Sequence, residues 1–269
     1  SRSAERPESL ALREGEQQIE TGRPCLPVDL LGNVISIPTK IILWHWKVDR
    51  HHVSSNTVSV LSRYLADNEL GNVKIRLNEY APGGEWSRLF RNRSVGAGWR
   101  YTLGLLTAIE YTILPGRLFG GDSFNPFTDT VSLYSDLPAI ALHEAGHAKD
   151  LAKRKYKGSY AAVRLVPFVS LYQEALATGD AVGYARDRYW TDVEKQEYNV
   201  LYPAFGTYIG GEASRFYEGP GYLFSLGAAI PGHIIGRIKA ALVRDVPPDH
   251  AGSASSGGGC RPESVPADQ

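Results

Sequence analysis

The sequence predicts an α+β fold, with short strands in the first half of the chain and long helices in the second. Residues 72–80 alternate between apolar and polar side chains, which is typical of a strand. Residues 135–158, and the segment that starts near Pro167, carry patterns typical of helices. Because strands precede helices, we expect a domain whose helices gather at one end.

The first 119 residues are expected to supply a peripheral arm and one part of this domain. Residues 1–24 are polar and charged, which indicates a flexible arm, and residues 25–119 form an N-terminal α/β portion. Within it, residues 53–68 have the apolar spacing of a helix. Residues 30–46 are apolar but interrupted by glycine, asparagine, proline and lysine, which favours a strand or an interfacial segment over a membrane helix.

The rest of the chain divides into a second portion, residues 120–245, and a tail of residues 246–269, whose glycine, serine and proline content indicates disorder. Residues 219–236 carry no formal charge. The length of this uncharged segment is near the lower limit for a helix that spans a bilayer. Five glycines and two prolines interrupt this segment, so we expect it to be buried or to line a cleft, with a membrane segment as the alternative. Two glycine pairs have the spacing found where helices pair closely: Gly206 with Gly210, and Gly232 with Gly236.

One short motif dominates the second portion: His143-Glu144-Ala145-Gly146-His147. On a helix, histidines four residues apart share one face and can bind one zinc ion. Glu144 would then lie beside the metal, where it can take a proton from a zinc-bound water. Gly146 lowers helix propensity, which indicates that a neighbouring element approaches closely there.

The residues around the motif place it in the middle of a helix. Ser135 and Asp136, followed by Pro138, predict the start of that helix. Basic residues between 153 and 157 suit the negative end of the helix dipole. Gly158 predicts the end of the helix.

A catalytic zinc site usually has three protein ligands, so a third ligand is needed. The second helix, from Pro167, offers Glu174 and Asp180. Because a helix rises about 1.5 Å per residue, the chain returns to the level of the histidines near Glu174, and Asp180 lies about one turn farther on. The geometry favours Glu174 but does not decide between the two carboxylates.

The motif followed by Glu174 in a Glu-Ala-Leu-Ala setting resembles the gluzincins, zinc metallopeptidases with an HExxH helix and a glutamate on a following helix. The resemblance covers residues 120–190. It implies that residues 120–245 form a zincin-like catalytic portion with Glu144 as the general base. The zinc ligands it implies are His143, His147 and Glu174.

The resemblance also implies an edge strand beside the motif helix, pairing with extended substrate, and residues 125–134 are its candidate. The chain departs from the family at one point. Many gluzincins carry an aspartate three or four residues after the glutamate, where this chain has Ala177 and Thr178. Asp150 and Asp180 are the alternatives for supporting the ligands from behind.

The group that would stabilise the oxyanion is not fixed by the pattern. His233, in the uncharged segment, is one candidate if that segment folds over the cleft. Three tyrosines are further candidates: Tyr172, Tyr184 and Tyr198.

The function expected from these residues is zinc-dependent hydrolysis of peptide bonds, with Glu144 assisting the attack of zinc-bound water on a peptide or protein substrate. Two other functions are compatible with the same sequence features. One is a catalytically silent zinc-binding scaffold. The other is a membrane-associated protein whose glycine-spaced segments mediate assembly.

Composition limits the partners and the compartment. The 269 residues include 29 basic and 29 acidic ones, so no excess of positive charge indicates nucleic acid as a partner. Cys25 and Cys260 are too far apart in sequence to form a metal motif, and a disulfide or two free thiols both remain open. Residue 1 is serine and methionine is absent, which favours an exported protein, periplasmic, secreted or membrane-associated, that has lost a leader.

Overall fold

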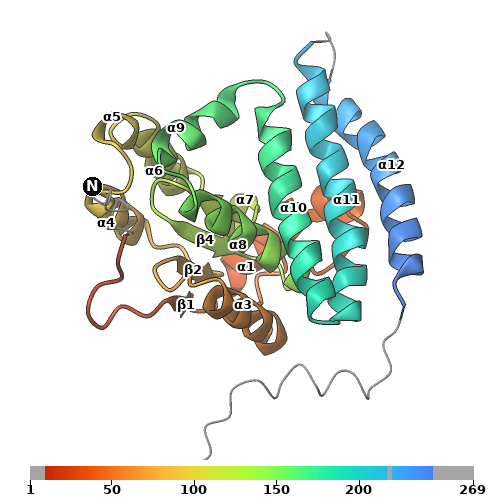
Figure 1. Ribbon diagram of the computed structural model, residues 1–269, viewed down its shortest axis with the longest axis horizontal. Helices are drawn as coiled ribbons and strands as arrows, with labels where there is room; N and C mark the ends of the chain where they lie inside the picture. Colours follow the sequence, from red (N-terminus) through yellow and green to blue (C-terminus); the bar gives the residue numbers. More distant parts are fainter. Residues whose placement is uncertain (1–9, 217–219, 245–269) are drawn as a thin grey trace, which may run out of the picture.

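The computed structural model describes residues 10–216 and 220–244, and it combines a small sheet with many helices (Figure 1). The strands are β1 (Ile19–Thr21), β2 (Lys74–Leu77), β3 (Ser123–Asn125) and β4 (Thr130–Leu133). The first helices are α1 (Leu26–Ile35), α2 (Ile37–Ile42), α3 (Ser55–Asp67), α4 (Pro82–Arg91), α5 (Ala97–Arg100), α6 (Leu103–Ile113) and α7 (Gly116–Phe119). The later ones are α8 (Pro138–Ala152), α9 (Lys157–Ala162), the 3₁₀ turn η1 (Val163–Leu165), α10 (Val169–Asp187), α11 (Thr191–Ser214) and α12 (Gly221–Leu242). The predicted α+β class is confirmed, as are the strand within 72–80 and the helices at 53–68 and after Pro167.

The sheet has the strand order β1-β2-β4-β3. Strands β1, β2 and β4 are parallel, and β3 pairs antiparallel with β4, with Phe124 opposite Val131. The two edge strands are therefore β1 and β3. The prediction of an edge strand within residues 125–134 is wrong in position, because β4 lies inside the sheet and is paired on both sides.

The main core lies between the sheet and the helices α3 and α8. Leu61 and Tyr64 of α3 meet Ile75 of β2, Val131 of β4 and Leu142 of α8, and all five are fully buried. Each large apolar side chain buried in this way stabilises the fold by roughly 2 kcal/mol. The core therefore fixes α8, the helix that carries the motif, against the sheet.

Helix α8 starts at Pro138, as predicted, but Ser135 and Asp136 do not cap it. The Asp136 carboxylate instead accepts hydrogen bonds from the Ser54 backbone N–H (2.9 Å) and the Thr57 hydroxyl (2.8 Å) at the start of α3. Asp136 therefore caps a different helix, one that is distant in sequence.

Helix α8 also ends earlier than predicted, at Ala152, and Gly158 lies inside the separate helix α9. A Cβ at Gly158 would come within 2.8 Å of the Trp99 Cβ. Gly158 is therefore required by close packing between α9 and α5 rather than by a helix end.

Helices α10, α11 and α12 stand side by side as a bundle (Figure 1). Helices α11 and α12 touch backbone to backbone, because a Cβ at Gly232 would lie 2.7 Å from the Pro203 Cα and one at Gly236 would meet the Tyr198 carbonyl. Gly206 and Gly210 face the backbone of α12 in the same way. The glycine spacing seen in the sequence thus serves a contact within this chain.

Two predictions for the N-terminal part are wrong. Residues 10–24 are not a flexible arm, since they include β1 and since Glu16 pairs with the buried Lys74 and Arg88. Residues 30–46 lie largely in the helices α1 and α2, so the strand, one of the two alternatives for this segment, is wrong, and the interfacial segment stays a prediction. Proline stands in the first turn of both helices, where its missing N–H costs nothing.

Residues 221–242 form one helix, α12, most of which is not buried and which lines neither of the cavities that Glu144 lines. Its buried residues are mostly small, and its large apolar side chains, including Ile230 and Ile234, are exposed. Across the described ranges, no helix has both the length and the apolar character needed to cross a membrane. The predicted tail of residues 246–269 and Cys260 lie outside the described residues; within them, Cys25 is a free thiol.

Candidate metal centre

Helices α8 and α10 bring His143, His147 and Glu174 together. The Nε2 atoms of the two histidines lie 3.2 Å apart. Oε2 of Glu174 lies 3.0 Å from Nε2 of His143 and 3.4 Å from Nε2 of His147. Three atoms that can each bind a metal thus converge on one point.

These distances fit a tetrahedral zinc site. Zinc bonds of about 2.0 to 2.1 Å to nitrogen and oxygen place neighbouring ligands about 3.3 Å apart in a tetrahedron. The three observed separations lie close to that value. Two imidazoles and a carboxylate are also the donor set of many catalytic zinc sites, which keep one position open.

Small residues let the two helices approach closely enough for this. A Cβ at Gly146 would lie 3.2 Å from the carbonyl oxygen of Ala177, so the backbones of α8 and α10 nearly touch. The close approach predicted from Gly146 is confirmed. It sets the histidines of one helix within reach of the glutamate of the other.

Thr178 supports the first histidine from behind, since its hydroxyl lies 3.3 Å from Nδ1 of His143. A partner at Nδ1 keeps Nε2 available as the metal-binding atom. Thr178 occupies one of the positions where many gluzincins carry an aspartate. A hydroxyl therefore provides the contact at this position.

Asp150 and Asp180 are engaged elsewhere. Asp180 accepts hydrogen bonds from Tyr64 and Lys149, and Asp150 accepts them from Arg154 and Tyr160. Asp180 is therefore a packing contact between α10, α8 and α3, and the prediction that it supports the ligands is wrong. Asp150 lies on the wall of the cavity described below but does not support the ligands.

The charge of Glu174 is stabilised on both of its oxygens. Its Oε1 accepts a hydrogen bond from Arg164, and its Oε2 faces the two histidines. Burial alone would raise the pKa of Glu174. The hydrogen bonds from His143 and His147 outweigh this effect and hold that pKa well below its usual value. Arg164 thus leaves one oxygen of Glu174 for the metal.

Glu144 is buried beside the ligands without being one of them. Burial, with contributions from the carboxylates of Glu174 and Asp122, raises the pKa of Glu144 to about 7. A carboxyl with a pKa near neutrality can both accept and return a proton, which a general base for hydrolysis must do.

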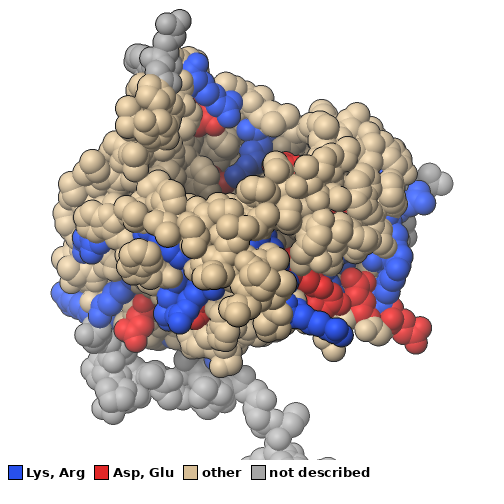
Figure 2. All heavy atoms as spheres, turned by 180° about the vertical axis from the view of Figure 1, so that it is seen from behind, with Lys and Arg blue, Asp and Glu red and all other residues tan. Residues whose placement is uncertain are grey.

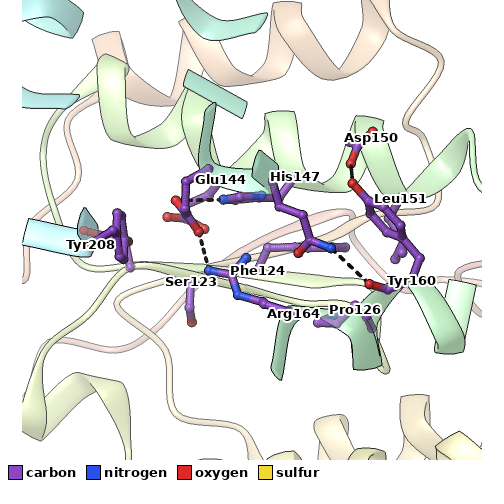
Figure 3. A pocket seen from close by; sticks show the side chains of 14 residues that line it. Ser123, Phe124, Pro126, Glu144, His147, Asp150, Leu151, Tyr160, Arg164 and Tyr208 are labelled. Carbon is purple, nitrogen blue, oxygen red and sulfur yellow. Dashed lines mark hydrogen bonds and ion pairs between the residues drawn. The ribbon is translucent and has the colours of Figure 1, made fainter. Parts of the chain in front are cut away.

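A cavity of about 280 Å³ opens in front of these groups. Figure 3 shows Glu144 and His147 on one side of it and Arg164 reaching in from the opposite side, near Ser123 and Phe124 of β3. Residues of β3, a strand at one edge of the sheet, thus form part of the cavity wall.

A second, smaller cavity of about 140 Å³ lies on the other side of Glu144. It is lined by Thr39 and Leu43 from α2 and its C-terminal end, and by His143, Glu144 and Tyr208. The motif helix therefore has open space on two sides, one bounded by β3 and one by α2.

The residues predicted to stabilise an oxyanion lie elsewhere. His233 stacks on Trp44 with ring centroids 4.3 Å apart, and its Nε2–H donates to the Ile42 carbonyl (2.7 Å). Tyr184 and Tyr198 bond to charged groups on α3, α10 and α11. These three predictions are wrong because the bundle holds each side chain away from both cavities that Glu144 lines.

Tyr208 and Asp122 line both cavities, and sequence reasoning missed them. Tyr208 is 41% exposed as a whole, but the partial burial of its phenol and the nearby carboxylates of Glu174 and Glu144 raise its pKa, so the phenol stays a hydrogen-bond donor. One signal could have found Tyr208. If α10 and α11 form an antiparallel pair that turns near residue 190, reflecting Glu174 across the turn leads to residues 206–208.

Comparisons with protein-family models, with curated proteins and with solved structures found no match for this chain.

Proposed function

We propose that this protein is a zinc-dependent metallopeptidase that hydrolyses peptide bonds. The observation that carries the proposal is the convergence of His143, His147 and Glu174 beside a cavity that Glu144 also lines. A metal cluster alone would suit a scaffold as well. The buried carboxyl of Glu144, which lines the cavity beside the cluster without belonging to the cluster, favours an enzyme.

The zinc would be held by the three ligands, where it would supply Lewis-acid polarisation of a water molecule and of the substrate carbonyl. Glu144 takes a proton from the attacking water and passes it to the nitrogen of the leaving amine. Tyr208, a protonated phenol on the cavity wall, is the candidate donor to the oxygen that gains charge.

The substrate would lie along β3. This strand pairs with β4 on one side, and its residues line the cavity on the other. An extended peptide can add to such an edge through backbone hydrogen bonds, which fits a peptide better than a compact small molecule.

The test is a paired measurement of zinc content and peptide cleavage, using elemental analysis and a mixture of unrelated peptides read by mass spectrometry. We expect about one zinc per chain and cleavage that Glu144→Gln lowers about a hundredfold or more while zinc stays bound. His143→Ala should lose both zinc and cleavage. Exposed Glu110 on α6 provides the control, since Glu110→Gln should change neither.

Two results would contradict the proposal. If the wild type binds zinc but cleaves no peptide, the scaffold is the better explanation. If Glu144→Gln cleaves at the wild-type rate, Glu144 is not the general base.

A further inference from the structure

Helices α1 and α2 turn their charged residues inward and their apolar residues outward. Asp29 is ion-paired with Arg117 at 2.8 Å, and Lys40, 3% exposed, donates to the carbonyl oxygens of Asn33 and Asp49, both at 3.2 Å. The outer side of this pair is apolar and exposed: Leu26, Leu30, Leu31, Val34, Ile35, Ile37 and Ile41. A helix pair that faced water would show the opposite arrangement.

Helix α12 presents an exposed apolar side of the same kind. The residues that reach α11 are mostly glycine and alanine, so the large side chains point the other way. Those exposed are Leu223, Leu226, Ile230, Ile234, Ile235, Ile238 and Leu242. No charged residue interrupts the helix before Arg237.

The two apolar sides form one surface. Ile41 and Trp44 line a groove together with Ile230 and Ile234, and only a trace of its wall is polar. His233 fastens the end of α2 to α12 through its bond to the Ile42 carbonyl and its stacking on Trp44. We call this surface, formed by the exposed apolar residues of α1, α2 and α12, the apolar face.

Within the two segments that form the apolar face, the exposed charges are all positive. Residues 26–54 and 220–244 contain two acidic residues, Asp29 and Asp49, and both are turned inward. The exposed charged residues of these segments are Lys47, Arg50, Arg237, Lys239 and Arg244. Figure 2 shows this side of the molecule: Lys and Arg lie along its lower part, where some Asp and Glu also appear, and most of the remaining surface is uncharged.

Two tryptophans, Trp44 and Trp46, lie between the apolar face and the positively charged residues beside it. Trp44 is 63% exposed and holds a left-handed backbone conformation (φ 51°), which is rare for a large side chain. The guanidinium of Arg237 lies 4.7 Å from its ring centroid. Trp46, 69% exposed, follows two residues later, beside Lys47. Tryptophan paired with a cation is the composition that proteins place at the level of lipid headgroups.

We propose that the apolar face docks on the surface of an anionic lipid bilayer, with its leucine and isoleucine side chains among the acyl chains and its cations at the phosphate groups. Contiguous exposed apolar surface of this extent marks a contact site, and the adjoining charges select its occupant. A second copy of this chain would bring the same positive charges against one another, whereas anionic lipid complements them. The inference rests on surface residues and does not depend on peptidase activity.

The test is cosedimentation of the full chain with vesicles of phosphatidylcholine, with and without one quarter phosphatidylglycerol. We expect binding that is stronger on the anionic vesicles and weaker at high salt. The double variant Ile230→Asp with Ile234→Asp places two charges in the apolar face and should need at least about tenfold more lipid for half-maximal binding. Both positions are exposed, so its melting temperature should match that of the wild type.

Tyr156→Asp is the matched control. Tyr156 is 69% exposed and precedes α9, outside the apolar face, so this variant should bind vesicles like the wild type. The proposal is overturned if the wild type binds neither kind of vesicle, or if the double variant binds the vesicles as well as the wild type does. It is also overturned if light scattering shows a dimer that the double variant breaks while no vesicles are bound, since a second copy would then occupy the face.

Discussion

The contact between α8 and α10 and the contact between α11 and α12 both depend on residues without large side chains, but they serve different ends. At the first contact, Gly146 meets Ala177, and buried polar groups are brought to one point. At the second, Gly232 and Gly236 meet the backbone of α11, and large apolar groups are turned outward. Where two helices approach closely through small residues, their larger side chains must lie on the other faces of the helices. The same kind of contact can therefore gather polar groups at a candidate metal centre or leave apolar groups on the surface.

The largest expected effect concerns the first contact. Glu174→Ala removes a ligand oxygen and leaves the two histidines without a carboxylate partner, so zinc affinity should fall by about a thousandfold, more than the loss of a supporting residue causes. Asp180→Ala, on the same helix, is the control, because Asp180 bonds to Tyr64 and Lys149 instead. Zinc affinity is measured by competition with a chelator. Equal losses in the two variants would mean that Glu174 is not a ligand.

The second contact is tested by a matched pair of glycines on α12. In Gly236→Ala the new methyl would meet the Tyr198 carbonyl, so the free energy of unfolding should fall by roughly 1 to 3 kcal/mol. In Gly227→Ala the methyl meets nothing within 4 Å, so the gain in helix propensity should raise the free energy of unfolding by up to about 1 kcal/mol. Urea unfolding measures both. If the two variants shift in the same direction, α12 does not pack on α11 through its glycines.

A buried carboxyl in the bundle gives the next effect. Burial, with the nearby carboxylates of Glu194 and Asp180, raises the pKa of Glu197 to about 9, so the folded state keeps a proton that the unfolded chain loses above its ordinary pKa. The free energy of unfolding contributed by this group therefore falls as pH rises from about 4.5 toward 9. Glu197→Gln should remove this dependence and stabilise the protein by about 2 kcal/mol more at pH 8 than at pH 6.5. Melting curves across that range measure it, and a pH-independent difference would contradict the prediction.

The smallest effect returns to the metal centre. Thr178→Val keeps the shape of the side chain but removes the hydroxyl near Nδ1 of His143. Zinc affinity should fall about tenfold, the lower end of what the loss of such a partner costs. Thr102→Val is the control, because the exposed Thr102 hydroxyl donates to the Gly98 carbonyl instead. An unchanged affinity in Thr178→Val would mean that this hydroxyl does not orient the histidine.

Much of the site could be predicted from sequence because it depends on helix geometry. The spacing of the histidines and the level of Glu174 follow from the rise of a helix, and the close approach at Gly146 follows from the cost of glycine there. What failed depends on tertiary contacts. Asp136 resembles a local cap but bonds to a helix far away in sequence, and Asp180 is occupied by a tyrosine from α3.

The fold was hardest to predict where the surface does not follow the usual distribution of polarity. Residues 30–46 have no polar face to reveal a helical period, since the outer side of α1 and α2 is apolar and their few charged residues are inside. His233 is a candidate for the site only if its uncharged segment folds over the cleft, whereas that segment belongs to the apolar face.

Helix α2 has one further consequence. Thr39 and the adjoining Leu43 line the small cavity that reaches Glu144, while Ile41 and Trp44 line the groove on the outside. On this side of the molecule, one helix separates the outer surface from the space beside Glu144, the proposed general base. A molecule that contacts Ile41 and Trp44 from outside therefore contacts the helix whose other side bounds the small cavity.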